Sequence, residues 1–239
     1  MSDDELLQAV RKLRADGYAP KEIARALGVR PAAVAPLVQM IATERPISEG
    51  EPELVGCWVS PGWRAGLTIS GHPEWPGGEA VADAEVSGLV AVLLAREDRR
   101  RRLSVCGYLL DVWCLGVKNA LGPRRMDRGE LAVFRRYYFG PWESSGVHAP
   151  IELARELVFG AVEYARTLGF HPHSDFERAR VHLGAWKRPS AIGFGRDGTP
   201  FYADGPYDDP ERVLRTLEES VGHGNFHFAV SVGHAEPVA

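Results

Sequence analysis

Gly-Leu-Val-Ala-Val-Leu-Leu-Ala, residues 88–95, and Leu-Ser-Val-Cys-Gly-Tyr-Leu-Leu-Asp-Val-Trp, residues 103–113, are the two segments that decide the fold. The charged segment Arg-Glu-Asp-Arg-Arg-Arg-Arg, residues 96–102, separates them. Two apolar runs on either side of a short polar segment predict a β-hairpin. Because the first run has no polar side chain, we expect it to be buried on both faces, as an interior strand of a sheet is.

The chain after this hairpin can be interpreted in two ways. Five side chains fall at helical spacing, which would give a buried helix over residues 110–121: Leu110, Trp113, Cys114, Val117 and Leu121. The alternative is that the strand continues to Trp113 and is followed by a loop or a short helix. We favour the strand, because Gly116 interrupts the helical pattern.

The remainder of the chain predicts alternating helices and strands. Residues 151–168 place apolar side chains on one helical stripe. Shorter helices are expected over residues 176–183, with Ser174 as N-cap, and from Pro210 to about Val221. Strands are expected over residues 54–59, 192–194, 200–203 and 226–230, with a turn at 195–198 that pairs 192–194 and 200–203 as a hairpin. We therefore predict an α+β domain with a mixed sheet over residues 54–239.

Residues 1–42 have the pattern of three short helices, with helix-start signals at Asp3, Pro20 and Pro31. This is the pattern of a small trihelical DNA-binding module. Residues 43–53, which are rich in proline, glycine and glutamate, predict a linker between this module and the larger domain.

The third helix of this module has few side chains that can read DNA bases. Base edges are recognised by Arg, Lys, Asn, Gln or a carboxylate, and in residues 31–40 only Gln39 is of this kind. Residues 1–42 carry six basic and five acidic side chains, which gives little attraction to phosphates. The module resembles the broad helix-turn-helix superfamily, whose members mostly bind DNA. Its departure at the reading helix indicates docking to a protein partner, homo-oligomerisation or weak DNA binding instead.

Charge is distributed unevenly along a chain whose net charge is −4. Residues 96–136 carry eleven basic and five acidic side chains, and four of the basic ones are Arg99, Arg100, Arg101 and Arg102 at the tip of the hairpin. A nucleic acid or another polyanion would bind here rather than at the N-terminal module. The alternative is that the arginines are simply solvated at an exposed turn, as most charge runs are.

Two tryptophans lie in a turn-rich stretch that follows the first expected strand. Trp63 and Trp75 are surrounded by prolines and glycines, which is typical of a long surface loop. Such aromatic side chains can cover a pocket or stack on a flat ligand, or they can attach the loop to the domain. We favour attachment, because an ordered loop of this length must bury some of its side chains.

Asp111, Cys114 and Lys118 place polar and reactive groups in the most apolar part of the chain. A carboxylate and an ammonium that are both buried need partners, and each could be the partner of the other. Catalytic sites are built from the same groups, because burial next to a charge moves pKa values toward neutrality. Asp111, Lys118 and Cys114 are therefore our candidate catalytic residues, with a structural ion pair as the competing interpretation.

His171, His173 and Asp175 are the candidate metal ligands. Two imidazoles and a carboxylate within five residues could converge on one divalent ion. A turn that contains Pro172 explains the same spacing, and no further ligand at helical spacing completes a known zinc pattern. We expect no cofactor other than such an ion.

Three blocks of the larger domain are similar to blocks in bacterial hypothetical proteins of uncharacterised activity. They are residues 110–120, residues 200–210 and the segment Gly-His-Gly-Asn-Phe-His-Phe over residues 222–228. The similarity covers roughly residues 85–230 and implies no catalytic residue.

Two hypotheses about function follow. The first is a cytoplasmic binding or regulatory protein, with a degenerate helix-turn-helix module and an α+β domain that binds a ligand or partner. The second is a hydrolase or nuclease-like enzyme that uses Asp111 and Lys118 with His171, His173 and Asp175. We favour the first, because no nucleotide-binding, serine-hydrolase or zinc-protease fingerprint occurs. The acidic N-terminus, the lack of a long apolar run and three unpaired cysteines indicate a cytoplasmic protein without a membrane anchor.

Overall fold

The computed structural model describes residues 3–15, 20–31, 33–34, 36–37, 52–71, 75–76, 87–98 and 101–230. The chain divides into two compact units, Met1–Glu51 and Pro52–Ala239. The division lies within the segment that we interpreted as a linker. Three of the predicted binding residues lie outside the described residues: Gln39, Arg99 and Arg100.

The first unit contains two helices, α1 (Asp3–Ala15) and α2 (Pro20–Leu27). Val10 of α1 packs against Ile23 and Ala24 of α2, and Val34 completes this small core. The expected third helix falls on a segment of which residues 31, 33–34 and 36–37 are described. The trihelical module therefore stays a prediction.

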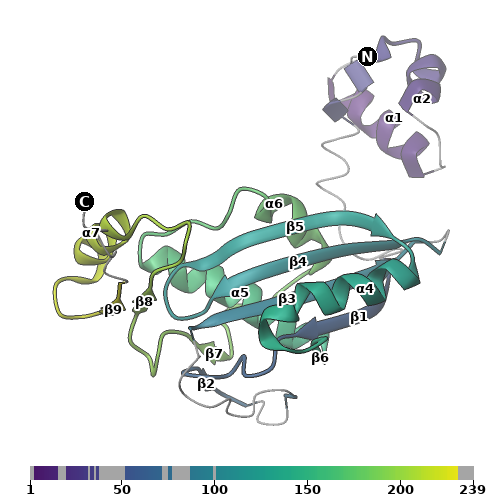
Figure 1. The fold of residues 1–239 in the computed structure, drawn as a ribbon. Helices are drawn as coiled ribbons and strands as arrows, with labels where there is room; N and C mark the ends of the chain where they lie inside the picture. Colours follow the sequence, from purple (N-terminus) through teal and green to yellow (C-terminus); the bar gives the residue numbers. More distant parts are fainter. Residues whose placement is uncertain are drawn as a thin grey trace, which may run out of the picture. The chain divides into compact units, whose positions relative to one another are not determined.

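The second unit is built on a five-stranded sheet with the order β5-β4-β3-β1-β6 (Figure 1). Its strands are β1 (Glu53–Val59), β3 (Leu89–Glu97), β4 (Leu103–Asp111), β5 (Gly116–Met126) and β6 (Val147–His148). The predicted hairpin is confirmed as β3 and β4, with Leu93 opposite Gly107. Every neighbouring pair in this sheet is antiparallel, so the predicted α+β class is confirmed and the predicted mixed sheet is wrong.

The helical interpretation of residues 110–121 is wrong, and the favoured strand is confirmed as far as Asp111, where a turn follows it. The prediction did not include the next strand, β5, which the chain forms after this turn. The Oδ1 atom of Asp111 accepts hydrogen bonds from the backbone amides of Trp113, at 3.0 Å, and Cys114, at 2.9 Å, and these bonds close the turn. Gly116 has a φ of +70°, and a Cβ atom there would lie 2.6 Å from the Cβ atom of Ala165. The glycine that appeared to interrupt a helix thus permits a tight reversal against a neighbouring helix.

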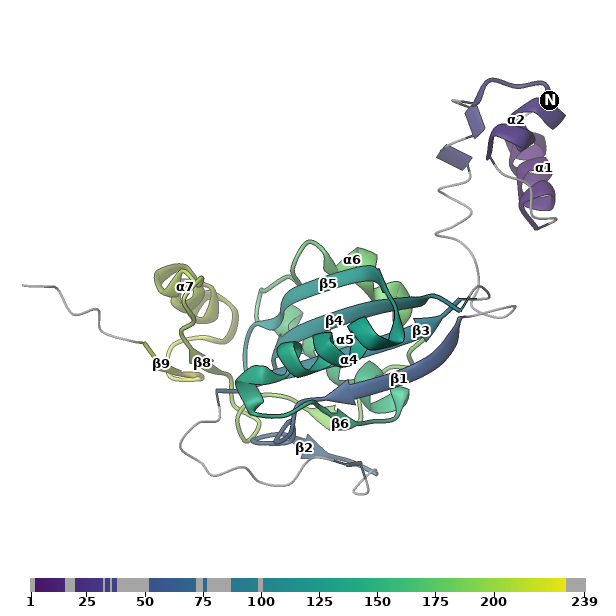
Figure 2. The same ribbon diagram turned by 45° about the vertical axis from the view of Figure 1, so that its right-hand side comes forward.

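The two faces of the sheet are covered by different helices (Figures 1 and 2). On one face, α5 (Ile151–Thr167) and the short α6 (Phe176–Ala179) pack against Val92, Tyr108 and Leu110. On the other, α4 (Arg128–Tyr138) packs against Leu93 and Leu103. A capping box fixes the start of α4, since the Asp127 side chain accepts from the amide of Glu130 and the Glu130 side chain accepts from the amide of Asp127.

The C-terminal part adds two small ladders instead of the predicted hairpin. β7 (Ile192–Gly193) pairs with β2 (Thr68–Ile69), and β8 (Phe201–Ala203) pairs in parallel with β9 (His227–Ala229). A bridge between Arg196 and Thr199 does turn the chain. The hairpin prediction is wrong because the two strands leave this turn toward different partners.

Of the two short helices predicted in this part, one is confirmed fully and the other in part. α7 (Pro210–Val221) begins as expected, because the Asp209 side chain accepts from the amide of Arg212 at 3.2 Å. The helix expected over residues 176–183 is divided into α6 and a 3₁₀ helix, η3 (Arg180–His182). Its N-cap is Asp175 rather than Ser174, without a hydrogen bond from the side chain.

The two loop tryptophans attach the loop to the domain, as predicted. Trp63 is 1% exposed, Trp75 is 9% exposed, and their ring centroids are 6.3 Å apart. The indole N–H of Trp63 donates to the carbonyl of Pro76 at 2.8 Å. Among the described residues, no helix is long and apolar enough to cross a membrane.

Candidate functional site

A cavity of about 540 Å³ opens on the face of the sheet that α4 covers in part. We call it the sheet pocket. Seven of its lining residues come from β3, β4 and β5 and form its floor: Leu89, Ala91, Gly107, Leu109, Asn119, Ala120 and Leu121. Its walls come from the loop after β1, from the end of α4 and from the 3₁₀ helix η2 (Gly140–Trp142) with Glu143.

The floor follows from strand periodicity. Alternate residues of a strand point to the same face, and the register sets Ala91 and Asn119 on either side of Leu109 and sets Leu121 opposite Gly107. Leu89, Leu109 and Leu121 are only half-buried. α4 ends at Tyr138 and packs on the other half of this face, so the floor is left uncovered by the described elements.

Tyr138 forms the wall between the covered half and the pocket. Its hydroxyl donates to the carbonyl of Val92 at 3.3 Å, and its ring stacks on Phe134 with centroids 5.7 Å apart. A Cβ atom on Gly107 would lie 2.9 Å from the Tyr138 hydroxyl. Gly107 therefore lets the ring lie directly on the strand. Burial raises the pKa of Tyr138, so the hydroxyl stays protonated and keeps its donor role.

Trp142 and Glu143 form the adjacent part of the wall. The amide of Glu143 donates to the carbonyl of Gly140 at 2.9 Å, which closes the turn. Glu143 has a φ of 49°, in the left-handed region that few residues other than glycine occupy. Among the residues that line the pocket, Glu143 is the one charged residue.

The structure gives two of the predicted catalytic residues, Asp111 and Lys118, different partners. Lys118 does not pair with Asp111; its Nζ atom lies 2.8 and 2.6 Å from the two carboxylate oxygens of Asp208. Asp208 Oδ2 also accepts from the amide of Gly205 at 2.9 Å. Lys118 thus connects β5 to the segment before α7, and the expected Asp111–Lys118 pair is wrong.

Asp111 and Cys114 are enclosed rather than open to a substrate. Asp111 is 4% exposed, and burial raises its pKa from 3.8 to about 6, although backbone amides and Lys118 oppose that shift. Burial and the nearby Asp111 carboxylate also raise the pKa of the Cys114 thiol, which therefore stays protonated and is a poor nucleophile. The hydroxyls of Tyr164 and Tyr202 are buried without a hydrogen-bond partner among the described residues.

The candidate metal ligands do not converge. His173 Nδ1 lies 4.0 Å from Asp175 Oδ2 and accepts from the amide of Asp175 at 3.2 Å, as in a simple turn. His171 is exposed. Among the described residues, no group of three or more His, Cys, Asp or Glu side chains could hold a metal ion.

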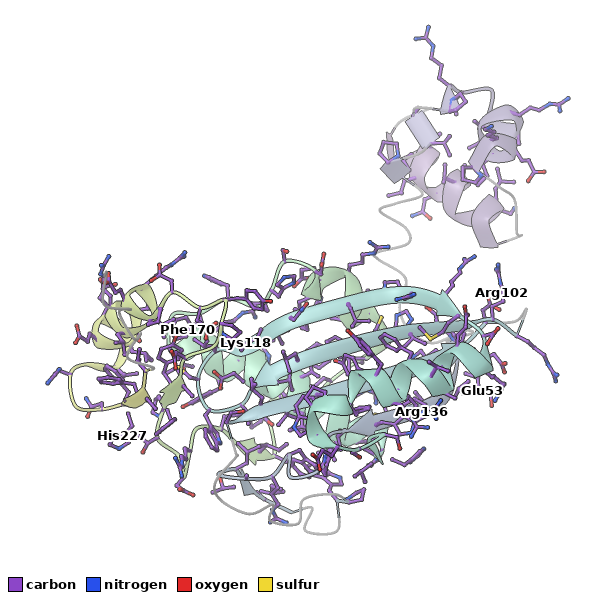
Figure 3. All side chains as sticks on the ribbon, viewed as in Figure 1. Glu53, Arg102, Lys118, Arg136, Phe170 and His227 are labelled. Carbon is purple, nitrogen blue, oxygen red and sulfur yellow. The ribbon has the colours of Figure 1, made fainter. Side chains whose placement is uncertain are left out.

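One described arginine at the tip of the β3–β4 hairpin, and one at the start of α4, have acidic neighbours. Arg102 lies 3.4 Å from Asp98, and Arg128 of α4 lies 3.2 Å from Glu97. Arg101 is exposed. Figure 3 shows Arg102 and Lys118 at opposite ends of the sheet, so the predicted polyanion surface and the predicted catalytic residues do not form one site.

A polar contact that the sequence did not indicate joins η3 to the sheet. Ser104 Oγ lies 2.8 Å from His182 Nε2, and Arg96 Nε donates to the His182 carbonyl at 2.8 Å. Burial, followed by the Arg96 charge, lowers the pKa of His182 to about 4, so the ring is neutral at pH 7. A base of such low pKa is poorly suited to activating a serine. We interpret the contact as structural.

The sequence also did not single out Tyr138, Trp142 and Glu143. The one signal that could have indicated them is the turn-rich stretch Gly-Pro-Trp-Glu over residues 140–143, directly after a helix with aromatic residues at its end. Comparison with protein-family models, curated proteins and solved structures finds no match for this chain. The proposals below therefore depend on the geometry of the chain itself.

Proposed function

We propose that the second unit binds a small, mainly apolar molecule in the sheet pocket, and that the chain is a binding or regulatory protein. The observation that carries this proposal is the open floor of Leu89, Leu109 and Leu121 beside α4. Ligand pockets are concave and mostly apolar, with a few polar groups, and they enclose about 300–1,000 Å³. The sheet pocket has this size and composition.

The polar residues of the pocket lie where they could orient a ligand. Asn119 and Ser87 line the pocket and are exposed, and Glu143 lies beside Trp142. The leucines of the floor would bury an apolar body, because covering apolar surface is favourable by roughly 25 cal/mol per Å². The polar side chains would then select among ligands of similar size.

The enzyme hypothesis receives less support from the geometry. The proposed residues have separate partners: Lys118 is engaged by Asp208, and the Asp111 carboxylate is engaged by backbone amides. His171 and Asp175 are exposed on another loop. General acid–base chemistry needs such groups to face one reacting atom, so we keep binding as the proposed function.

The N-terminal unit would act as a docking, dimerising or weakly DNA-binding module in this proposal. By analogy, a unit of this kind in the same chain as a ligand-binding domain is typical of regulators. We also propose a cytoplasmic location, because Cys57, Cys106 and Cys114 are all free and buried, as in proteins of reducing compartments.

Binding can be tested with N-phenyl-1-naphthylamine, a neutral dye that becomes fluorescent in apolar surroundings. We expect the parent chain to enhance its emission saturably. Asn119→Trp should weaken this binding at least tenfold, because the larger side chain would fill part of the pocket. The matched control is Arg125→Trp, since Arg125 is also exposed on β5 but does not line the pocket. No saturable enhancement, or equal binding by both variants, would contradict the proposal.

A further inference from the structure

The sheet pocket has an electrostatic preference that narrows the class of ligand it would take. This step rests on the proposed function. Glu143 is the one charged residue among those that line the pocket, and two aromatic residues, Tyr138 and Trp142, line it close to Glu143 in the chain. A positively charged group would be attracted both to a carboxylate and to the faces of aromatic rings.

Glu143 is not committed to another part of the protein. Within the described part of the chain, its carboxylate has no ion-pair or hydrogen-bond partner. Other acids near α4 do have partners: Glu130 accepts from the amide of Asp127, and Glu97 pairs with Arg128. The Glu143 carboxylate is thus available to a ligand.

The backbone at Glu143 would suit glycine better than glutamate. A left-handed conformation costs a residue with a Cβ atom about 1 kcal/mol or more, and Gly146, a few residues later, occupies this region with a φ of 82°. The chain nevertheless places a carboxylate at residue 143, beside the pocket. A bent backbone alone would not require an acidic side chain there.

Two arginines of this neighbourhood are engaged outside the pocket. The Arg135 guanidinium lies 4.2 Å from the ring centroid of Trp58 and donates to the Ser145 carbonyl. The Arg124 guanidinium lies 5.8 Å from the ring centroid of Phe134. Neither arginine lines the pocket, and the described residues that line it include no Lys or Arg, so the lining supplies no cation for Trp142 and Glu143.

We infer that the ligand is an organic cation, an amine or a quaternary ammonium group attached to an apolar body. The apolar body lies on Leu89, Leu109 and Leu121. The cationic group lies at Trp142 and Glu143, where the ring and the carboxylate both favour positive charge. The alternative of an anionic ligand is disfavoured, because its charge would meet the Glu143 carboxylate.

The test uses three probes of similar shape that compete with the bound dye: benzyltrimethylammonium, its neutral isostere neopentylbenzene, and phenylmethanesulfonate. We expect the cation to displace the dye at a concentration at least tenfold lower than the anion does. Glu143→Gln should weaken binding of the cation about five- to tenfold, which corresponds to about 1–1.4 kcal/mol, and should leave binding of the neutral probe unchanged. Glu219→Gln, at an exposed acid of α7, is the control of equal charge change and should alter none of the three.

Equal displacement by the cation and the anion, or an unchanged affinity for the cation in Glu143→Gln, would overturn the inference while the dye result still supports a binding pocket. No saturable enhancement of the dye would overturn the proposed function and, with it, the inference that rests on it.

Discussion

The two faces of the five-stranded sheet come from alternate residues of the same strands, yet they have different surroundings. Leu110 points toward α5 and α6 and is fully buried, whereas Leu109, the preceding residue of β4, is half-buried on the floor of the sheet pocket. The α5 face is closed by two helices and by Ile192 and Phe194. The α4 face is closed only in part, by α4 and its Tyr138. The first face therefore supplies stability, and the second supplies the candidate site.

The comparison predicts unequal costs for equal truncations on neighbouring residues. Leu110→Ala should lower the free energy of unfolding by about 3–4 kcal/mol, because it leaves a cavity in a closed core. Leu109→Ala should cost about 1 kcal/mol, because its side chain is already partly in solvent. Urea unfolding of both variants measures the difference. Equal costs would show that the α4 face is as closed as the α5 face.

A second prediction concerns Asp111, which lies at the end of β4. Its pKa is raised in the folded protein, so the protonated form is favoured there. The stability that this provides is complete below pH 3.8 and is lost as the pH rises toward 6. The parent should lose this stability between pH 3.5 and pH 7, whereas Asp111→Asn should not. The free energy of unfolding of the variant should therefore rise by about 3 kcal/mol relative to that of the parent over this range. The variant keeps the Oδ1 acceptor of the turn. A difference between the two proteins that does not change with pH would contradict the raised pKa.

The Lys118–Asp208 ion pair, which connects β5 to the segment before α7, should have a smaller effect on the free energy of unfolding. Lys118 and Asp208 are 18% and 11% exposed, so solvent screens their attraction only in part. Asp208→Ala should cost about 2 kcal/mol, because it leaves Lys118 and the Gly205 amide without an acceptor. The double variant with Lys118→Met should recover about 1 kcal/mol of this loss. Thermal unfolding of the single and double variants measures the coupling energy between Lys118 and Asp208. If the costs of the two single substitutions add up to the cost of the double substitution, the ion pair does not contribute to stability.

The sequence predicted the interior of this fold better than its edge. The β3–β4 hairpin could be predicted because both strands are dense in apolar residues. β5 was missed because it is an edge strand, with Lys118, Asn119 and Arg125 on it and Pro123 within it. An edge strand has one partner and more solvent contact, so it lacks a continuous apolar signal.

The candidate site was harder to predict for a related reason. Its floor joins three strands, and its wall follows a helix, so the pocket exists only after segments far apart in sequence have met. Lys118 and Asp208 are 90 residues apart, and Ser104 and His182 are 78 residues apart. Asp111 and Lys118 appeared to be partners because they are close in the chain. The turn after Asp111 engages its carboxylate with backbone amides instead.

His182 gives a pH dependence of stability whose sign is opposite to that of Asp111. Its folded pKa is lowered to about 4, so the stability it provides is complete above pH 6.5 and is lost as the pH falls toward 4. His182→Gln should therefore lose less stability than the parent when the pH is lowered from 7 to 4. Urea unfolding at the two pH values measures this change. A parent and a variant that respond equally would show that His182 titrates normally.

The central claim, that the open half of the α4 face binds a ligand, is tested most directly by NMR of leucine methyl groups during a titration with N-phenyl-1-naphthylamine. The account predicts saturable shifts for the methyls of Leu89, Leu109 and Leu121, which lie on the floor of the pocket. The methyls of Leu110, Leu153 and Leu157, in the closed core, should stay unchanged. Shifts confined to the closed core, or no saturable shifts of the floor leucines, would contradict it.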